Sequence, residues 1–298
     1  MITTTNLPVV QRRRFGAVRR FAASRSAVVG ATGLTTIALL ALLAPVVAPY
    51  DPAAQDGTPL LGPSGAHLLG TDQLGRDIAS RMIHGARASL IVAAGAAAVG
   101  AGIGVPLGLV AGYLGRWADG VAMRVVDLLL AVPGILLALV IIAVLGPGRL
   151  NLILAIGIGA IPEFARLTRV ATLELRERDF VLAAKGMGAS TPDTMIRTVL
   201  PNVIGPILVQ FVITASTAVV VEAGLSFLGL GTPPPAPSWG GMLQDARSYL
   251  YQSPTYGLFP GLCLAATVFF LDRIGRGLQL VVGGGRRGTT GGLGGGAV

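Results

Sequence analysis

The residues that most often carry catalytic chemistry are few and far apart in this chain of 298 residues. Its two histidines, His67 and His84, lie in no H-E-x-x-H motif that could bind zinc. Its single cysteine, Cys263, can form neither an internal disulfide nor a thiolate metal cluster. Its single lysine, Lys185, is followed by glycine and lacks the G-x-x-x-x-G-K-[ST] pattern of a nucleotide-binding loop. We therefore predict no catalytic residues, no metal site and no cofactor in this chain.

Polar side chains inside apolar stretches are the remaining candidates for function. A carboxylate at the centre of a bilayer costs about 2.5 to 3.5 kcal/mol on insertion scales, so it must face water, an opposite charge or the interface. Arg124 and Asp127, three residues apart, are predicted to form a charge pair at the inner boundary. Five residues of one stretch are candidates for a substrate pathway: Gln210, Thr214, Ser216, Thr217 and Glu222. For Glu222, a place at the outer gate and a structural bond to the following loop both remain open.

The composition explains why these polar residues must lie in a membrane. The chain is 52% hydrophobic and only 12% charged, with a mean hydropathy of +0.72. Soluble domains carry about 25% charged residues, and disordered chains are poor in large apolar residues. The composition therefore excludes both classes and indicates a membrane protein.

Six charge-free stretches predict an all-α protein with six transmembrane helices, because a helix needs about 20 apolar residues to cross the bilayer. The fourth stretch is short and must extend into 163–171 or lie obliquely. The first could be a signal peptide, but it is longer than the usual apolar core of about 7 to 15 residues. The six stretches are 27–48, 88–115, 128–148, 150–162, 203–221 and 256–271, and together they define one transmembrane domain over 26–282.

The basic residues predict the orientation of these helices. The net charge is +9, and the basic residues lie between the apolar stretches. With segments 1–25, 116–124, 163–202 and 272–298 inside the cell, 18 of the 23 basic residues are internal, as the positive-inside rule requires. We therefore predict a cytoplasmic basic arm at 1–25, an outer loop at 225–255 and a flexible Gly-rich tail at 283–298, with both termini cytoplasmic.

Glycines recur every fourth position in the second stretch, at Gly100, Gly104, Gly108 and Gly112. Small residues at this spacing lie on one helical face and let two helix backbones approach closely. The pattern predicts a tight helix seam within a bundle.

Residues 163–202 predict a helix, a glycine turn and a second helix. The first helix would run from 165 to about 184 and break at Gly186 and Gly188. Thr191 would cap the second helix, which Pro201 would end. A DNA-binding helix-turn-helix has this shape, but five acidic residues and two flanking membrane stretches argue against nucleic acid. The segment is better interpreted as a surface that docks another protein.

Two further segments should lie outside. Residues 76–90 predict an amphipathic helix at the outer interface, with Asp77 and Arg81 able to pair. The proline run at 232–237 can only be extended, and Trp239 after it suits an interfacial position or the surface of a partner. This outer loop could receive a solute-binding protein or could be structural.

Three separated blocks resemble one family. Residues Ala183, Ala184, Gly188, Leu200 and Pro201 resemble the E-A-A, G, I-x-L-P loop of permease subunits of ATP-binding-cassette (ABC) importers, with Leu182 in place of the glutamate and Thr198 in place of the isoleucine. LGTDQLGRDIASRMIHGARASL (69–90) and EAGLSFLGLGTPPPAPSWGGML (222–243) are similar to blocks of the dipeptide, oligopeptide and nickel permeases.

This resemblance implies a permease in the prokaryotic inner membrane with the transmembrane fold of a type I importer (MetI-like). It implies a homologous second permease, two ATPase subunits that hold ATP and magnesium, an extracytoplasmic solute-binding protein and surrounding lipid. It also implies that Ala183, Ala184, Gly186, Gly188, Leu200 and Pro201 couple the helices to the ATPases. A peptide is the expected solute, although a nickel chelate or haem stays open. The alternative is a secondary transporter or channel driven by an ion gradient, which would commonly show inverted repeats and midplane ionisable residues.

Overall fold

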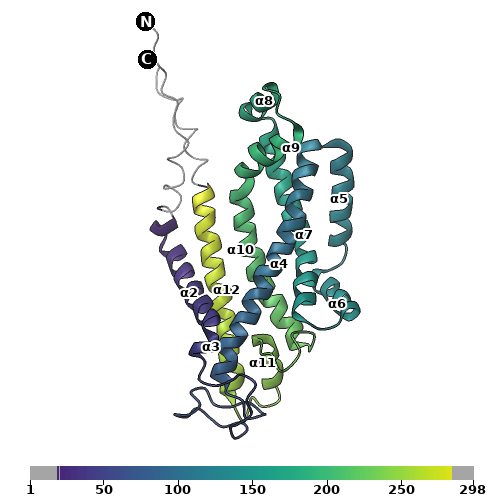
Figure 1. The fold of residues 1–298 in the computed structure, drawn as a ribbon. Coiled ribbons are helices and arrows are strands. Elements are labelled where there is room, and N and C mark those ends of the chain that lie inside the picture. Colours follow the sequence, from purple (N-terminus) through teal and green to yellow (C-terminus); the bar gives the residue numbers. More distant parts are fainter. Residues whose placement is uncertain (1–18, 20, 284–298) are drawn as a thin grey trace, which may run out of the picture.

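The structure is a computed structural model that describes residue 19 and residues 21–283 (Figure 1). Most of the predicted basic arm and nearly all of the predicted Gly-rich tail lie outside the described residues. The described chain is helical apart from its loops and one isolated bridge between Thr71 and Asp77. Its helices are α2 (Arg25–Leu42), α3 (Ala44–Val47), α4 (Ile78–Leu114), α5 (Arg116–Leu130), α6 (Gly134–Leu145), α7 (Arg149–Arg176), α8 (Asp179–Gly186), α9 (Thr191–Asp193), the π-helix η1 (Thr194–Val199), α10 (Leu200–Phe227), α11 (Trp239–Ala246) and α12 (Pro254–Gly283).

Five helical segments of the described chain are long and apolar enough to cross a bilayer, and the bent pair α5–α6 could supply a sixth span. The five are α2, α4, α7, the continuous segment Thr191–Phe227, and α12. The fourth predicted stretch does extend past 162, as α7.

The prediction of the third span as one straight helix is wrong. The chain bends by 83° between α5 and α6. Pro133 lies at the break, as the N-cap of α6, and a proline disfavours helical geometry in the residue before it, here Val132.

Helix α4 is longer than the sequence predicted, because the expected interfacial helix and the second span are one helix of 37 residues. Asp77 begins it, accepting a hydrogen bond from Ser80 N at 2.7 Å. Its first turn is packed inside the protein. Ile78 is fully buried there and clusters with Met242 of α11 and Tyr256 of α12.

The predicted glycine seam is confirmed, and α7 is its partner. A Cβ on Gly104 would lie 2.6 Å from Ile161 O, and one on Gly112 would lie 2.7 Å from Arg169 O. Side chains at these positions would force the two backbones apart. Helix α10 packs against both α4 and α7, α12 packs on α10, and α2 lies at the edge against α12.

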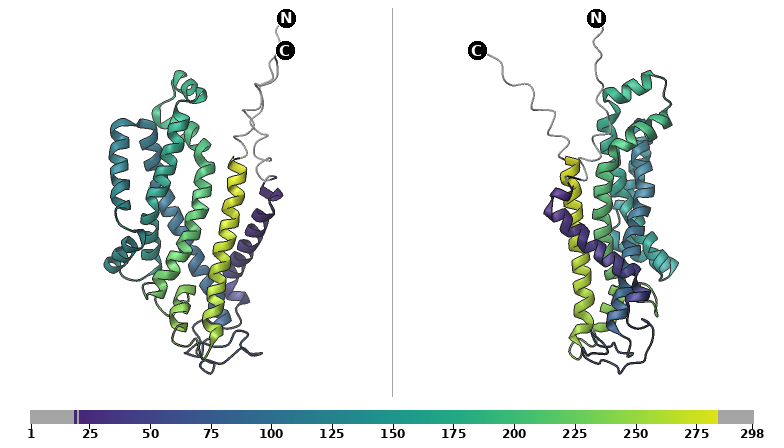
Figure 2. Two further views of the ribbon diagram at one scale, coloured as in Figure 1. Left: turned by 180° about the vertical axis from the view of Figure 1, so that it is seen from behind. Right: turned by 60° about the vertical axis from the view of Figure 1, so that its left-hand side comes forward.

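The two ends of the molecule differ in structure (Figures 1 and 2). Helices α8 and α9 form one end, and the start of α2 and the last turn of α12 point toward it. Residues 48–77 and α11 form the opposite end, at the bottom of Figure 1.

The loop between α7 and α10 differs from the predicted pair of helices. Helix α7 ends at Arg176, and the short α8 follows. The cap of the next helix is Ser190, whose hydroxyl accepts from Asp193 N, rather than Thr191. Pro201 does not end that helix, which passes through η1 into α10. The π-helix ends at Val199, two residues before Pro201, so the irregular turn lies directly before the residue that has no N–H to donate.

Candidate functional site

A cluster of polar side chains lies between α7 and α10. Gln210 Nε2 donates to Glu163 Oε2 at 2.7 Å and lies 3.3 Å from Thr214 Oγ1. Next to it, α6, α7 and α10 enclose a cavity of about 310 Å³ whose polar side chains are those of Glu163, Thr214 and Thr217. Glycine, alanine and aliphatic side chains form the rest of the lining. Three predicted pathway residues, Gln210, Thr214 and Thr217, therefore lie together, and Glu163 is a fourth that the prediction missed.

The other two predicted pathway residues lie elsewhere. Ser216 lines a second cavity, between α10 and α12, beside the ion pair of Asp272 with Arg276 (2.9 Å). Glu222 is 1% exposed and accepts hydrogen bonds from Ser89 Oγ at 3.0 Å and Ser226 Oγ at 2.8 Å. Its burial between α4 and α10 fits the structural interpretation better than a place at the outer gate.

Helix α5 is tied to α7 by two ion pairs. Asp127 Oδ1 lies 2.7 Å from Arg166 Nη2, and Asp119 forms a two-atom pair with Arg169. The predicted pair of Arg124 with Asp127 is therefore wrong. Arg124 instead lines a shallow groove on α5 with apolar neighbours. The carboxylate of Asp127 faces α7, where a cation of another helix is within reach.

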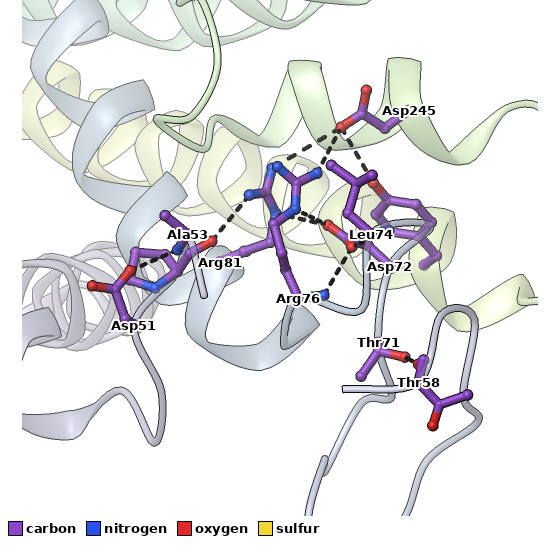
Figure 3. A network of polar contacts seen from close by, with 11 residues as sticks. Asp51, Ala53, Thr58, Thr71, Asp72, Leu74, Arg76, Arg81 and Asp245 are labelled. Atoms are coloured by element: carbon purple, nitrogen blue, oxygen red, sulfur yellow. Dashed lines mark hydrogen bonds and ion pairs between the residues drawn. The ribbon is translucent and has the colours of Figure 1, made fainter. Parts of the chain in front are cut away.

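A compact charge cluster joins four segments at the end formed by α11 (Figure 3). Asp72 Oδ2 lies 2.5 Å from Arg76 Nε and 3.4 Å from Arg81 Nε. Asp245 of α11 lies 3.7 Å from Arg76 and 4.0 Å from Arg81, and accepts from Tyr256 Oη of α12 at 3.3 Å. Two cations thus meet two carboxylates. The two carboxylates offset part of the cost of burying the two arginines, which would otherwise be uncompensated buried charges.

Two predictions for this end are wrong. Arg81 pairs with Asp72 and not with Asp77, whose carboxylate caps α4 and lies 3.0 Å from His67 Nδ1. The side chain of Trp239 is not free to contact lipid or a partner. It is 1% exposed, and its Nε1 donates to Met82 O at 3.0 Å. The proline run is thus followed by a buried tryptophan whose hydrogen bond holds α11 against α4.

The predicted coupling residues lie around α8. Ala183, Gly186 and Gly188 are exposed and Ala184 is partly exposed. Val181 is fully buried and holds α8 against a cluster that includes Tyr113 of α4. Leu200 and Pro201 lie where η1 passes into α10, and Leu200 packs against the same cluster as Val181.

Gly188 has a φ of +87°, a conformation that glycine adopts without strain. A Cβ there would meet nothing within 4 Å. Position 188 therefore favours glycine because of its backbone conformation, and not because a side chain would clash. This conformation defines the turn that follows α8.

Two family models match the sequence. The model of the "binding-protein-dependent transport system inner membrane component" matches residues 104–280. A model of the "N-terminal TM domain of oligopeptide transport permease C" matches residues 16–63. The chain belongs to the family of binding-protein-dependent inner membrane transport components. It is thus a multi-pass membrane permease. Permeases of this family do not themselves catalyse a reaction.

Curated relatives match this chain over almost its whole length. The chain is 41% identical to a di/tripeptide transport system permease protein of Pseudomonas aeruginosa, covering 87% of this chain and 88% of the relative. It is 40% identical to a dipeptide transport system permease protein of Alkalihalophilus pseudofirmus, over 88% and 87%. It is 42% identical to a glutathione transport system permease protein of Pectobacterium atrosepticum, again over 88% and 87%.

Solved structures confirm the fold. A chain of the MetNI methionine ABC transporter in an inward-facing conformation aligns with a TM-score of 0.51 at 21% identity, covering 66% of this chain and 95% of that chain. A second crystal form of the same transporter aligns with a TM-score of 0.52. The predicted type I importer fold is therefore confirmed.

Proposed function

We propose that this chain is one permease subunit of an ATP-driven importer for small peptides in a prokaryotic inner membrane. The observation that carries the proposal is the 40–42% identity to peptide and glutathione permeases over at least 87% of the chain. The resemblance of residues 69–90 and 222–243 to the same family supports it.

The two ends support the proposed partners. Leu182 of α8 and Met187 directly after it are 51% and 82% exposed, and they would contact an ATPase subunit that holds ATP and magnesium. A second, homologous permease and a second ATPase would complete the symmetric core. A solute-binding protein would dock at the end formed by α11 and residues 48–77, and lipid would cover the remaining apolar faces.

The orientation in this proposal places α8, and with it both chain termini, in the cytoplasm. In the topology predicted from the sequence, the interior segments carry 18 of the 23 basic residues, in line with the positive-inside rule. Because α7 extends from 149 to 176, Arg166 and Arg169 of that count lie on a membrane helix. The chain itself hydrolyses no ATP. Closure of the ATPases on ATP would move α8, and rigid movement of the helices would open the pathway to the other side.

The peptide pathway would run along the cavity between α6, α7 and α10. Small residues such as Gly134 and Gly159 leave room there, and Glu163, Gln210, Thr214 and Thr217 provide polar contacts. After the bend between α5 and α6, the start of α6 lines this cavity through Gly134, Ile135 and Ala138. We assign α6 the role of a wall that moves when the pathway opens.

The conformation of Gly188 gives a direct test. In the reconstituted complex, Gly188→Val should leave the subunits associated but lower peptide-stimulated ATPase activity at least fivefold. A β-branched residue at a φ of +87° costs about 1 to 3 kcal/mol and would distort the turn after α8.

Gly186→Val is the matched control. Gly186 has no positive φ and also has open space around it, so a smaller loss is expected. Equal stimulation in wild type and Gly188→Val would contradict the assigned coupling role. Peptide uptake by this chain without any ATPase subunit would favour a transporter driven by an ion gradient.

A further inference from the structure

Glu163 lies in the middle of α7, one of the helices long and apolar enough to cross a bilayer. The helix has 28 residues and is therefore about 42 Å long at about 1.5 Å per residue. The hydrocarbon core is about 30 Å thick. In a helix of this length that spans the whole core, the middle of the helix lies inside the core wherever the core falls. The carboxylate of Glu163 is nevertheless exposed on the surface of this chain.

No cation of the described chain neutralises this carboxylate. Its hydrogen-bond partner is the neutral amide of Gln210, at 2.7 Å. Arg166, three residues further along α7, is bound to Asp127 at 2.7 Å instead. The polar surface formed by Asp127, Arg166, Glu163 and Gln210 therefore has one uncompensated negative charge, at Glu163.

The surroundings of Glu163 indicate water rather than lipid. An ionised carboxylate at this depth is costly against hydrocarbon and must face an aqueous path or an opposite charge. Glu163 lines the cavity of about 310 Å³ between α6, α7 and α10, a size at the lower end of small-molecule sites. Apart from Glu163, the cavity lining carries no charge, so a ligand there would meet a single negative group.

We propose that Glu163 is the recognition site in this permease for the ammonium group of a peptide in transit. This inference rests on the proposed function. An ammonium group that crosses the membrane loses hydration, and a fixed carboxylate at the same depth offsets part of that loss. Gln210 holds one oxygen of Glu163 and leaves the other free for the ligand. The ammonium comes from the peptide amino terminus or from a lysine side chain.

The test uses the complete complex in liposomes: both permeases, both ATPases, and binding protein loaded with labelled Ala-Ala or Lys-Ala. Glu163→Gln should lower uptake of both peptides at least fivefold if the amino terminus is recognised. A loss confined to Lys-Ala would assign the site to the side-chain ammonium. ATPase stimulation by the loaded binding protein should stay within twofold of wild type, because α8 is unchanged.

Two control variants separate recognition from assembly. Glu163→Asp keeps the charge and should restore at least half of the uptake. Arg25→Gln removes a charge at the exposed start of α2, a helix that does not line the cavity of Glu163, and should leave uptake within twofold.

The remaining outcomes overturn the inference. Unchanged uptake of both peptides in Glu163→Gln would do so. So would loss of subunit association or ATPase stimulation without rescue by Glu163→Asp, because Glu163 would then pair with a partner subunit. Wild-type complex that takes up neither peptide would reject the proposed function itself, a result visible before any variant is compared.

Discussion

Lys185 of α8 contacts the end of α4 through an aromatic ring. Its Nζ lies 4.7 Å from the ring centroid of Tyr113, within the range of a cation–π contact. The Tyr113 hydroxyl is buried and has no hydrogen-bond partner among the described residues. The ring face, and not the hydroxyl, is therefore the part of Tyr113 that holds Lys185. At the residue scale, this contact joins the proposed coupling helix to a second membrane helix besides α7.

A double-mutant cycle in the reconstituted complex tests this contact. Tyr113→Phe should keep peptide-stimulated ATPase activity within twofold, because phenylalanine retains the ring. Tyr113→Leu and Lys185→Met should each lower it about three- to tenfold, in line with a contact of about 1 kcal/mol. The double variant should be no worse than either single variant.

The conservative change Lys185→Arg serves as the control and should retain most of the stimulation. Fully additive losses in the Tyr113→Leu, Lys185→Met double variant would show that the two side chains act separately. A large loss in Tyr113→Phe would assign the role to the hydroxyl instead.

At the scale of the elements, α4 and α7 form one closely packed pair. Glycines of α4 bring its backbone against carbonyl oxygens of α7. Ion pairs link α5 to α7 as well. Because α7 leads into α8 within three residues, a movement of α8 would be carried by this pair rather than absorbed between its helices.

A glycine pair on α4 tests this packing. Gly104→Ala should destabilise the protein in detergent by about 1 to 3 kcal/mol, because its Cβ would lie 2.6 Å from Ile161 O and the seam would be overpacked. Gly102→Ala, two residues away, meets nothing within 4 Å and should change stability by less than about 1 kcal/mol. Denaturant unfolding followed by circular dichroism measures both. Equal effects would show that the seam does not depend on glycine.

At the scale of the whole molecule, the two ends differ in structure. At one end, α8 is followed by an exposed turn that contains Met187 and Gly188. The other is closed by the charge cluster of Asp72, Arg76, Arg81 and Asp245 and by the buried Trp239. Helix α4 takes part in both ends, through Tyr113 and through its first turn. The proposed orientation therefore places the charge cluster outside the cell.

Cysteine labelling tests the orientation. In a Cys263→Ala background, and without the ATPase subunits, Gly62→Cys should react with a maleimide that does not cross the inner membrane. Met187→Cys should react only after the membrane is permeabilised. Both positions are exposed, so accessibility in the fold does not limit either reaction. Labelling of Met187→Cys in intact cells would reverse the orientation.

The patterns that the sequence predicted correctly are local or periodic. Apolar stretches gave the helices around 27–48, 203–221 and 256–271, and the glycine spacing gave the seam of α4. Predictions of polar partners were mostly wrong. Asp127 and Arg81 were assigned partners on their own helices and found them elsewhere. Glu163 was missed as a pathway candidate because α7 was expected to leave the membrane there, although its place after an apolar run was the available signal.

The sequence by itself determined that the chain is a bundle of membrane helices, which helical face is small, and which family it resembles. These features depend on the apolar length of each segment and on residue spacing, both of which are properties of the chain alone. Only the tertiary structure decided that α5 and α6 bend apart, that Trp239 and Glu222 are buried, and that Glu163 faces a cavity beside Gln210. A polar side chain in a membrane bonds to whichever group the packed helices bring within about 3 Å, and that choice exists only after the helices pack.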